Sequence, residues 1–228
     1  MQWKLQRRNL GIALALLILL VSSPWPVAHA ASIFINEIHY DNSGADTGEA
    51  IEIAGSAGTN LSGWSIVLYN GNGGGIYNTI NLSGIIPDQQ NGFGTHAFFE
   101  TGIQNGSPDG LALVDTMSNV VQFLSYEGSF TALGGPANGL TSTDIGVSES
   151  SSTPLGYSLQ LSGTGSISSE FSWVAARAST FGSINTGQVI PASTPQPMPE
   201  PSTILLLGSG VAGLSFWRRM KGRKLICS

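Results

Sequence analysis

Five carboxylates gather in one glycine-containing stretch, residues 37–52, and they could supply ligands for a metal ion: Glu37, Asp41, Asp46, Glu49 and Glu52. Ca²⁺ takes about six to eight oxygen ligands from carboxylates, carbonyls and water, so this stretch is a candidate calcium site. The spacing does not follow an EF-hand loop. The sequence favours the alternative, a solvated hairpin in which Glu37 and Glu52 occupy outward-facing strand positions.

The sequence contains few candidate catalytic residues. Beyond the first 30 residues the only histidines are His39 and His96, and neither lies in an H-E-x-x-H pattern, so both are predicted to be surface or strand residues. Residues 54–58 (AGSAG) resemble a G-x-S-x-G nucleophile elbow but lack its first glycine. The sole cysteine, Cys227, lies in the tail. The sequence therefore predicts no catalytic residues, no enzyme activity, and no cofactor other than a possible Ca²⁺ ion.

Phosphate and carbohydrate are two further ligands for which the sequence offers candidate residues. Residues 71–75 are glycine-rich but lack the lysine and following helix of a phosphate-binding loop, which favours a hairpin loop. Aromatic side chains could form a carbohydrate-stacking face. Trp64 is expected in the core, whereas exposed tyrosines would allow contact with glycans. The residues concerned are Trp64, Trp173, Tyr40, Tyr69, Tyr77 and Tyr126.

Short apolar segments must position these residues. In several of them apolar and polar residues alternate, which is typical of strands with one buried face. The segments are 33–38, 51–53, 64–69, 111–114, 120–124, 157–161 and 171–174. Asn-Gly pairs, which supply positive φ in tight turns, recur at 70–71, 72–73, 91–92, 105–106 and 138–139. No stretch has sustained helical periodicity. The pattern predicts an all-β sandwich of about seven to nine strands.

Charge is distributed unevenly along the chain. Between Ala31 and Trp217 there is one cation, Arg177, and all fourteen Asp and Glu residues, which gives a net charge of 1 − 14 = −13. Such a body repels phosphate backbones, so no direct binding of nucleic acid is expected. It also has no cysteine for disulfides, and must be held together by a buried core.

The N-terminus has the order of a secretory signal peptide. A short basic segment precedes an apolar run, residues 10–21, and a small-residue site follows at Ala28-His29-Ala30. Residues 1–30 are therefore predicted to be a signal peptide, with cleavage in the region of Ala28, Ala30 and Ala31.

The C-terminus has three parts after a Pro/Ser/Thr linker at 189–198. Pro199, Glu200 and Pro201 are expected to be extended, because prolines flank the glutamate, and the short apolar segment 202–217 predicts a transmembrane helix. A basic cluster completes residues 199–224: Arg218, Arg219, Lys221, Arg223 and Lys224. Basic residues favour the cytoplasmic side, so both ends of the precursor are expected to stay inside while the body is exported. A permanent single-span anchor is the alternative reading.

Two resemblances bear on these expectations. With "INEIHYDNSGADTGEAIEI", "NLSGWSIVLYNGNGG" and "QNGSPDGLALVD", residues 31–188 resemble a bacterial extracellular lamin-tail domain, which implies an immunoglobulin-like β-sandwich. Residues 199–224 resemble a PEP-CTERM sorting signal. The second resemblance implies an exosortase and the export machinery as partners, an inner-membrane precursor, and a final location in the cell envelope or outside the cell.

The sequence thus predicts an exported, non-catalytic protein of the cell surface or extracellular matrix. Its sandwich would be an interaction module, and its neutral polar composition suits contact with extracellular polysaccharide. Lamin-tail domains often accompany secreted nucleases or phosphatases. The alternative is therefore an accessory or catalytic component of a secreted hydrolase system.

Overall fold

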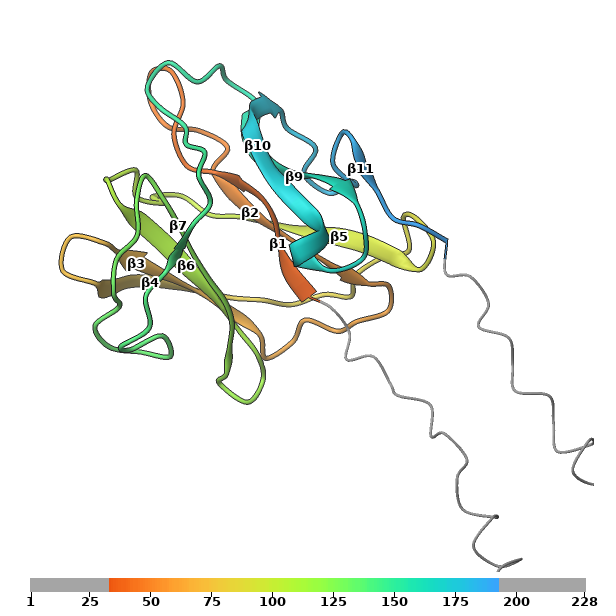
Figure 1. Ribbon diagram of the computed structural model, residues 1–228, viewed down its shortest axis with the longest axis horizontal. Coiled ribbons are helices and arrows are strands. Elements are labelled where there is room, and N and C mark those ends of the chain that lie inside the picture. Colours follow the sequence, from red (N-terminus) through yellow and green to blue (C-terminus); the bar gives the residue numbers. More distant parts are fainter. Residues whose placement is uncertain (1–32, 193–228) are drawn as a thin grey trace, which may run out of the picture. The chain divides into compact units, whose positions relative to one another are not determined.

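Residues 33–192 are described by the computed structural model, and they form an all-β fold of two sheets (Figure 1). The chain divides into two units, residues 1–189 and 190–228, and the strands found among the described residues belong to the first. The signal peptide, residues 193–198 of the linker, the sorting motif, the apolar segment and the basic cluster lie outside the described residues. Within residues 33–192, no helix is long and apolar enough to cross a membrane.

The first sheet has the strand order β10-β9-β1-β2-β5, with β11 paired to β9. All its pairings are antiparallel except that of β11 with β9. A short 3₁₀ helix, η1 (Ser168–Glu170), precedes β10. The strands are β1 (Ile33–His39), β2 (Ala50–Ser56), β5 (Phe93–Phe99), β9 (Tyr157–Thr164), β10 (Phe171–Ala178) and β11 (Gln188–Val189).

The second sheet has the order β4-β3-β6-β7-β8, and only the β7–β8 pairing is parallel. Its strands are β3 (Ser65–Asn70), β4 (Gly75–Asn81), β6 (Asp109–Val114), β7 (Val120–Tyr126) and β8 (Thr143–Asp144). The β3–β4 connection is a turn, as predicted from its glycines. Gly71 is required there by close approach, because an added Cβ would lie 2.0 Å from the carbonyl oxygen of Pro108.

The main hydrophobic core lies between the two sheets. It combines alternate residues of β1, β2 and β9 with alternate residues of β3, β6 and β7: Ile35, Ile38, Ile51, Ile53, Leu159, Ile66, Leu68, Leu111, Leu113 and Leu124. Because successive side chains of a strand point to opposite faces, this alternation buries one face of each sheet. The prediction of an all-β fold with two packed layers is confirmed.

Some details differ from the sequence expectations. Each of the seven expected segments lies at a strand, but β4, β5 and the two-residue strands β8 and β11 were missed. Trp64 precedes β3 instead of beginning it, although it does pack against the main core. Of the five Asn-Gly pairs, the glycines at 73, 92 and 139 have positive φ, whereas those at 71 and 106 do not.

Candidate functional site

The face of the first sheet that points away from the main core carries two neighbouring glutamates. A register shift between Ile35 and Glu37 interrupts the β1–β2 ladder, and Glu37 then pairs directly with Glu52. Both side chains are fully buried, at 0% exposure. The predicted outward, solvated positions of Glu37 and Glu52 are therefore wrong. Their face is indeed opposite to the main core, but another segment of the chain covers it.

Glu37 is surrounded by protein donors. Its Oε1 accepts hydrogen bonds from the Thr180 amide (2.8 Å), the Gln160 side chain (3.3 Å) and the Ser158 hydroxyl, and its Oε2 accepts one from the Thr180 hydroxyl (2.8 Å). Burial raises the pKa of Glu37 above its usual range, and these hydrogen bonds only partly oppose the rise. This carboxylate has no oxygen left without a protein partner.

Glu52 is the more strongly perturbed of the two carboxyls. Burial, together with the neighbouring charge of Glu37, raises its pKa to about 8, although hydrogen bonds from Asn36 and Gly182 act in the opposite direction. The Asn36 side chain donates to Oε1 at 2.9 Å, and the Gly182 amide donates to Oε2. The raised pKa values of both carboxyls favour one proton held by the buried pair near neutral pH.

The covering segment, which we call the strap, is residues 179–187 between β10 and β11. Besides Thr180 and Gly182, its Asn185 holds it to the sheet by donating to the carbonyl oxygens of Asn36 and Leu161, both at 3.0 Å. Gln188, at the start of β11, donates to the Asn36 side chain at 2.8 Å. The strap is thus attached to the sheet through polar side chains, and the two glutamates are its central acceptors.

His39 forms a second buried polar centre, with Glu149. The Nδ1 atom lies 2.9 Å from Glu149 Oε1, and the Nε2 atom lies 3.2 Å from both Asn42 Oδ1 and the Thr47 carbonyl oxygen. The Asn42 amide nitrogen donates elsewhere, so its oxygen is the atom that faces the ring. Every partner is an acceptor, and the geometry therefore calls for a proton on both ring nitrogens.

The charge of this pair follows from the same contacts. Burial lowers the pKa of His39, but the hydrogen bond to Glu149 and its negative charge outweigh burial and raise the pKa above the usual value. Glu149 also accepts from the amides of Tyr40 (2.7 Å) and Asp41 (3.0 Å). An imidazolium so enclosed has no lone pair for general-base catalysis. His39 is on a strand as expected, but it is not a surface residue.

The five carboxylates of the calcium prediction are divided by the fold. Glu37 and Glu52 lie under the strap, whereas Asp41 and Asp46 lie in the β1–β2 loop. Glu49 accepts from the Gly102 amide at 2.7 Å and so holds the β5–β6 loop. Among residues 33–192, no group of three or more His, Cys, Asp or Glu side chains is arranged to hold a metal ion. The separation gives no support to a five-carboxylate site, and calcium binding stays a prediction.

Three of the four tyrosines of the predicted stacking face are buried, and Tyr77 is partly buried against the main core. Tyr40 and Tyr126 are stacked with ring centroids 3.8 Å apart, and with Tyr69 they are at most 1% exposed. These rings serve the interior: the Tyr40 hydroxyl, for example, accepts from the Glu149 amide at 2.8 Å. Sequence alternation could not separate an exposed from a buried tyrosine, because loops cover both outer faces of the sandwich.

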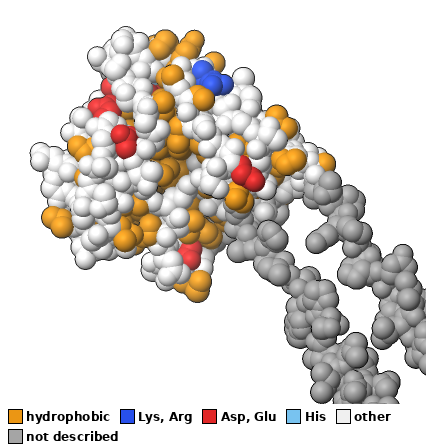
Figure 2. Space-filling model, viewed as in Figure 1, with side chains coloured by type: hydrophobic (Ala, Val, Ile, Leu, Met, Phe, Trp, Pro, Cys, Tyr) orange, Lys and Arg blue, Asp and Glu red, His pale blue; other side chains and the backbone are white. Residues whose placement is uncertain are grey.

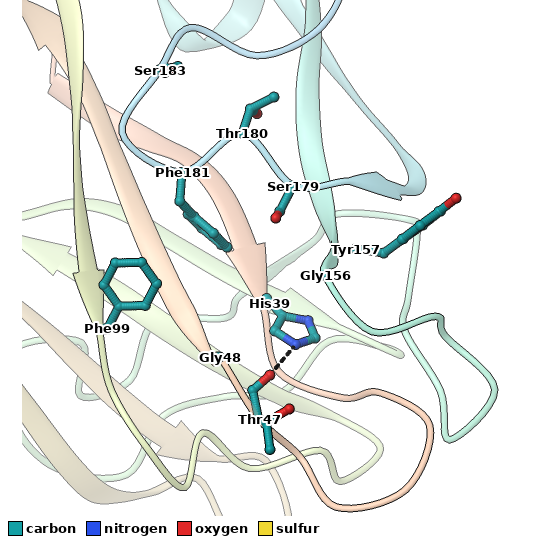
Figure 3. A pocket seen from close by; sticks show the side chains of 10 residues that line it. All are labelled: His39, Thr47, Gly48, Phe99, Gly156, Tyr157, Ser179, Thr180, Phe181 and Ser183. Atoms are coloured by element: carbon teal, nitrogen blue, oxygen red, sulfur yellow. Dashed lines mark hydrogen bonds between the residues drawn. The ribbon is translucent and has the colours of Figure 1, made fainter.

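A pocket of about 530 Å³ adjoins the strap (Figure 3). Figure 3 shows the ring of Phe99, at the end of β5, beside that of Phe181 on the strap, with His39 and Thr47 in the same region. The two phenylalanine rings meet edge to face, with centroids 5.8 Å apart. Hydroxyl groups complete the lining: Thr47, Tyr157, Ser179, Thr180 and Ser183. The pocket therefore combines aromatic rings with neutral hydroxyls.

Of the residues that line the pocket, the sequence analysis singled out His39, but not as part of a ligand site. Thr180 and Phe181 lie in a segment without strand or turn motifs, and Phe99 ends a strand that was missed. Glu149 is separated from its partner His39 by 110 positions. Only the pairing of distant segments brings these residues together, and no local signal in the sequence indicates it.

The surface is poor in charge. Residues 33–192 hold one Lys or Arg residue, Arg177, and thirteen carboxylates, a formal net charge of 1 − 13 = −12 with histidines counted as neutral, but several of these carboxylates are buried. Figure 2 accordingly shows a face dominated by neutral polar groups and scattered hydrophobic side chains. Such a surface is unsuited to binding polyanions.

Comparison with known proteins identifies the tail. Residues 199–219 match the family described as "PEP-CTERM protein-sorting motif". No curated protein and no solved structure gives a significant match to the chain. The motif implies an exported protein that an exosortase processes, with a membrane-anchored precursor and a final position at the cell surface. The resemblance of the tail to a PEP-CTERM signal is thereby confirmed.

Proposed function

We propose that this chain is a non-catalytic protein of the cell surface or extracellular matrix, whose β-sandwich is an interaction module. The observation that carries the proposal is the sorting motif at residues 199–219. The described part of the chain is an all-β fold of two sheets, as an interaction module would be. Within the proposal the sandwich is of the immunoglobulin-like, lamin-tail type, and extracellular polysaccharide is its partner.

The buried ionisable groups support a non-catalytic role. Glu37 and Glu52 are the pair that acid–base catalysis would use, but their oxygens accept from the strap and from neighbouring strands. His39 is held between Glu149 and two carbonyl-type acceptors. A substrate that reacted with either centre would have to replace several of these hydrogen bonds. A secreted hydrolase is the competing proposal, and turnover of DNA or phosphoesters that Glu37→Gln abolishes would favour it.

The sorting role is tested by replacing Pro199, Glu200 and Pro201 with alanine in the full-length chain. The variant keeps the apolar segment and the basic cluster. If the tail were only a membrane anchor, the variant would therefore stay in the membrane and remain uncleaved, as the wild type would. We expect the variant to stay unprocessed in the membrane fraction, while the wild type yields a shortened C-terminus by mass spectrometry. Deletion of residues 199–224 should release the body from the envelope. Normal processing of the alanine variant would contradict the proposal.

A further inference from the structure

The pocket between β5 and the strap has the chemistry of a sugar-binding site. We propose that it binds an uncharged sugar ring of a polysaccharide, with Phe99 and Phe181 as the stacking surface. This inference rests on the proposed function and specifies its ligand and its site. The volume of about 530 Å³ lies within the range of ligand pockets, roughly 300–1,000 Å³.

The aromatic pair provides the apolar part of the site. Phe99 is 70% exposed although it belongs to a strand whose other members are mostly covered, and Phe181 from the strap lies against it. The C–H face of a sugar ring is apolar, and it packs on an aromatic face whose quadrupole is negative. A ring bound there would cover hydrophobic surface that is otherwise left in water.

The hydroxyls provide the polar part. The side chains of Thr47, Tyr157, Ser179 and Ser183 line the pocket, and none donates to or accepts from another described side chain or backbone group. A hydroxyl both donates and accepts, as sugar hydroxyls do, so the two sets are complementary. Thr180 differs, because its hydroxyl is engaged by Glu37 and Asn185. Its role is to fix the strap.

The electrostatics select a neutral sugar. The charge of the His39 imidazolium is compensated by Glu149 inside the protein, and Glu37 lies directly below Thr180. His39 is the one positively charged side chain that lines the pocket, and it is already paired with Glu149, while the body around the pocket carries thirteen carboxylates against one arginine. A uronic acid would therefore be repelled, whereas a neutral hexose would not.

The strap makes the site rigid before any ligand arrives. Thr180 and Gly182, on either side of Phe181, donate backbone N–H groups to Glu37 and Glu52 respectively. The ring is therefore held from both sides in the chain, and little ordering is left to be done on binding. Because these hydrogen bonds fix its backbone, Phe181 can form part of the stacking surface although it lies in a loop.

Binding is measured by affinity electrophoresis and calorimetry with the full-length chain in a polyoxyethylene detergent, which has no sugar headgroup to compete. The probes are dextran, galactomannan and xyloglucan as neutral polymers, alginate as an anionic polymer, and a short peptide rich in proline and tyrosine. We expect binding to at least one neutral polymer and none to alginate. Short oligosaccharides of that polymer should compete, which places the recognition in the sugar ring.

Phe99→Ala and Phe181→Ala should each weaken that binding by about five- to tenfold, the usual value of one aromatic stacking contact. Met117→Ala is the matched control: Met117 is 77% exposed and lies in the β6–β7 turn of the other sheet. Phe99→Trp should retain binding. Near-ultraviolet circular dichroism checks that each variant keeps its fold.

The remaining outcomes separate this inference from the proposed function. Binding of a neutral polymer that neither alanine variant weakens would overturn the pocket and leave an interaction module. Binding to none of the neutral polymers, or to the peptide alone, would overturn the sugar assignment. Either result leaves tail-dependent sorting intact, because that depends on residues 199–224.

Discussion

Each sheet has an outer face, away from the main core, that a loop covers, but the two covers are built differently. On the second sheet, the 127–142 loop lays Phe130, Ala132 and Ala137 against apolar residues of β3, β6 and β7. Phe123 and Phe130 meet edge to face there at 5.4 Å. On the first sheet, the strap is attached through Glu37 and Glu52. One cover is hydrophobic, and the other depends on hydrogen bonds to ionisable groups.

In both sheets a loop covers the outer face, but the two kinds of contact make different demands on the protein. Burying apolar surface requires no partner of defined geometry. Burying a carboxyl requires donors for each oxygen, and its free energy changes with protonation. The apolar cover should therefore respond to loss of volume, and the polar cover to pH.

The largest expected effect is the pH dependence of stability. Glu52 has a folded pKa of about 8, above its ordinary value of 4.5, so its contribution to stability is fully present below about pH 4.5 and is lost as pH rises through 8. The difference corresponds to on the order of 5 kcal/mol. The pKa values of Glu37 and His39 are also raised, which acts in the same direction. Denaturant unfolding from pH 4.5 to 9, followed by tryptophan fluorescence, measures it.

Glu52→Gln keeps the shape and an acceptor oxygen but cannot ionise. Its stability should vary much less than that of the wild type between pH 5 and 8. A wild type that becomes more stable over this interval would contradict the assignment of the buried pair.

The second effect tests the apolar cover. Phe130→Ala removes a ring that is 8% exposed and should lower the free energy of unfolding by about 3–5 kcal/mol. The loss should be equal at pH 5 and pH 8, because Phe130 packs in a cluster of hydrophobic side chains that includes Val67, Tyr69 and Phe123. Exposed Met117→Ala should change stability by less than about 0.5 kcal/mol. If the loss of unfolding free energy caused by Phe130→Ala depended on pH, the proposed difference between the apolar and the polar cover would be wrong.

The smallest effect concerns one strap contact. Thr180→Val removes the hydroxyl donor to Glu37 and keeps the backbone donor, so we expect a loss of about 1–2 kcal/mol in unfolding free energy. Ser183→Ala on the same segment should have almost no effect, because that hydroxyl has no partner among the described residues. Equal effects of the two substitutions, measured at pH 7, would mean that the hydrogen bond from the Thr180 hydroxyl to Glu37 does not hold the strap.

The sequence predicted the elements that bury one face and alternate clearly, such as β3 and β9. It missed β4 and β5, because both are outer strands of their sheets and carry little apolar alternation: GIYNTIN and FGTHAFF. Edge strands have only one neighbour to satisfy, so their composition is less constrained.

The candidate site was predicted less well than the fold. Glu37 and Glu52 were singled out, but as ligands or solvated residues, since nothing nearby in the chain covers them. The covering Thr180 lies 143 positions after Glu37, and Phe99 is contributed by a missed strand. Alternation tells which face a residue occupies, whereas only long-range pairing tells whether that face meets water.

The scarcity of Lys and Arg in the body, where Arg177 stands alone, affects how the exported protein resists proteolysis. Between Arg8 and Arg218 it is the single Lys or Arg, and it lies half-buried in β10, where it is paired with Ser158 of β9. Proteases that cleave after basic residues need a segment that can adopt an extended conformation without a neighbouring strand. In this body the one such peptide bond follows Arg177, and it lies within a sheet. Trypsin-like secreted proteases should therefore leave the folded body whole, and tryptic peptide surveys should record it poorly.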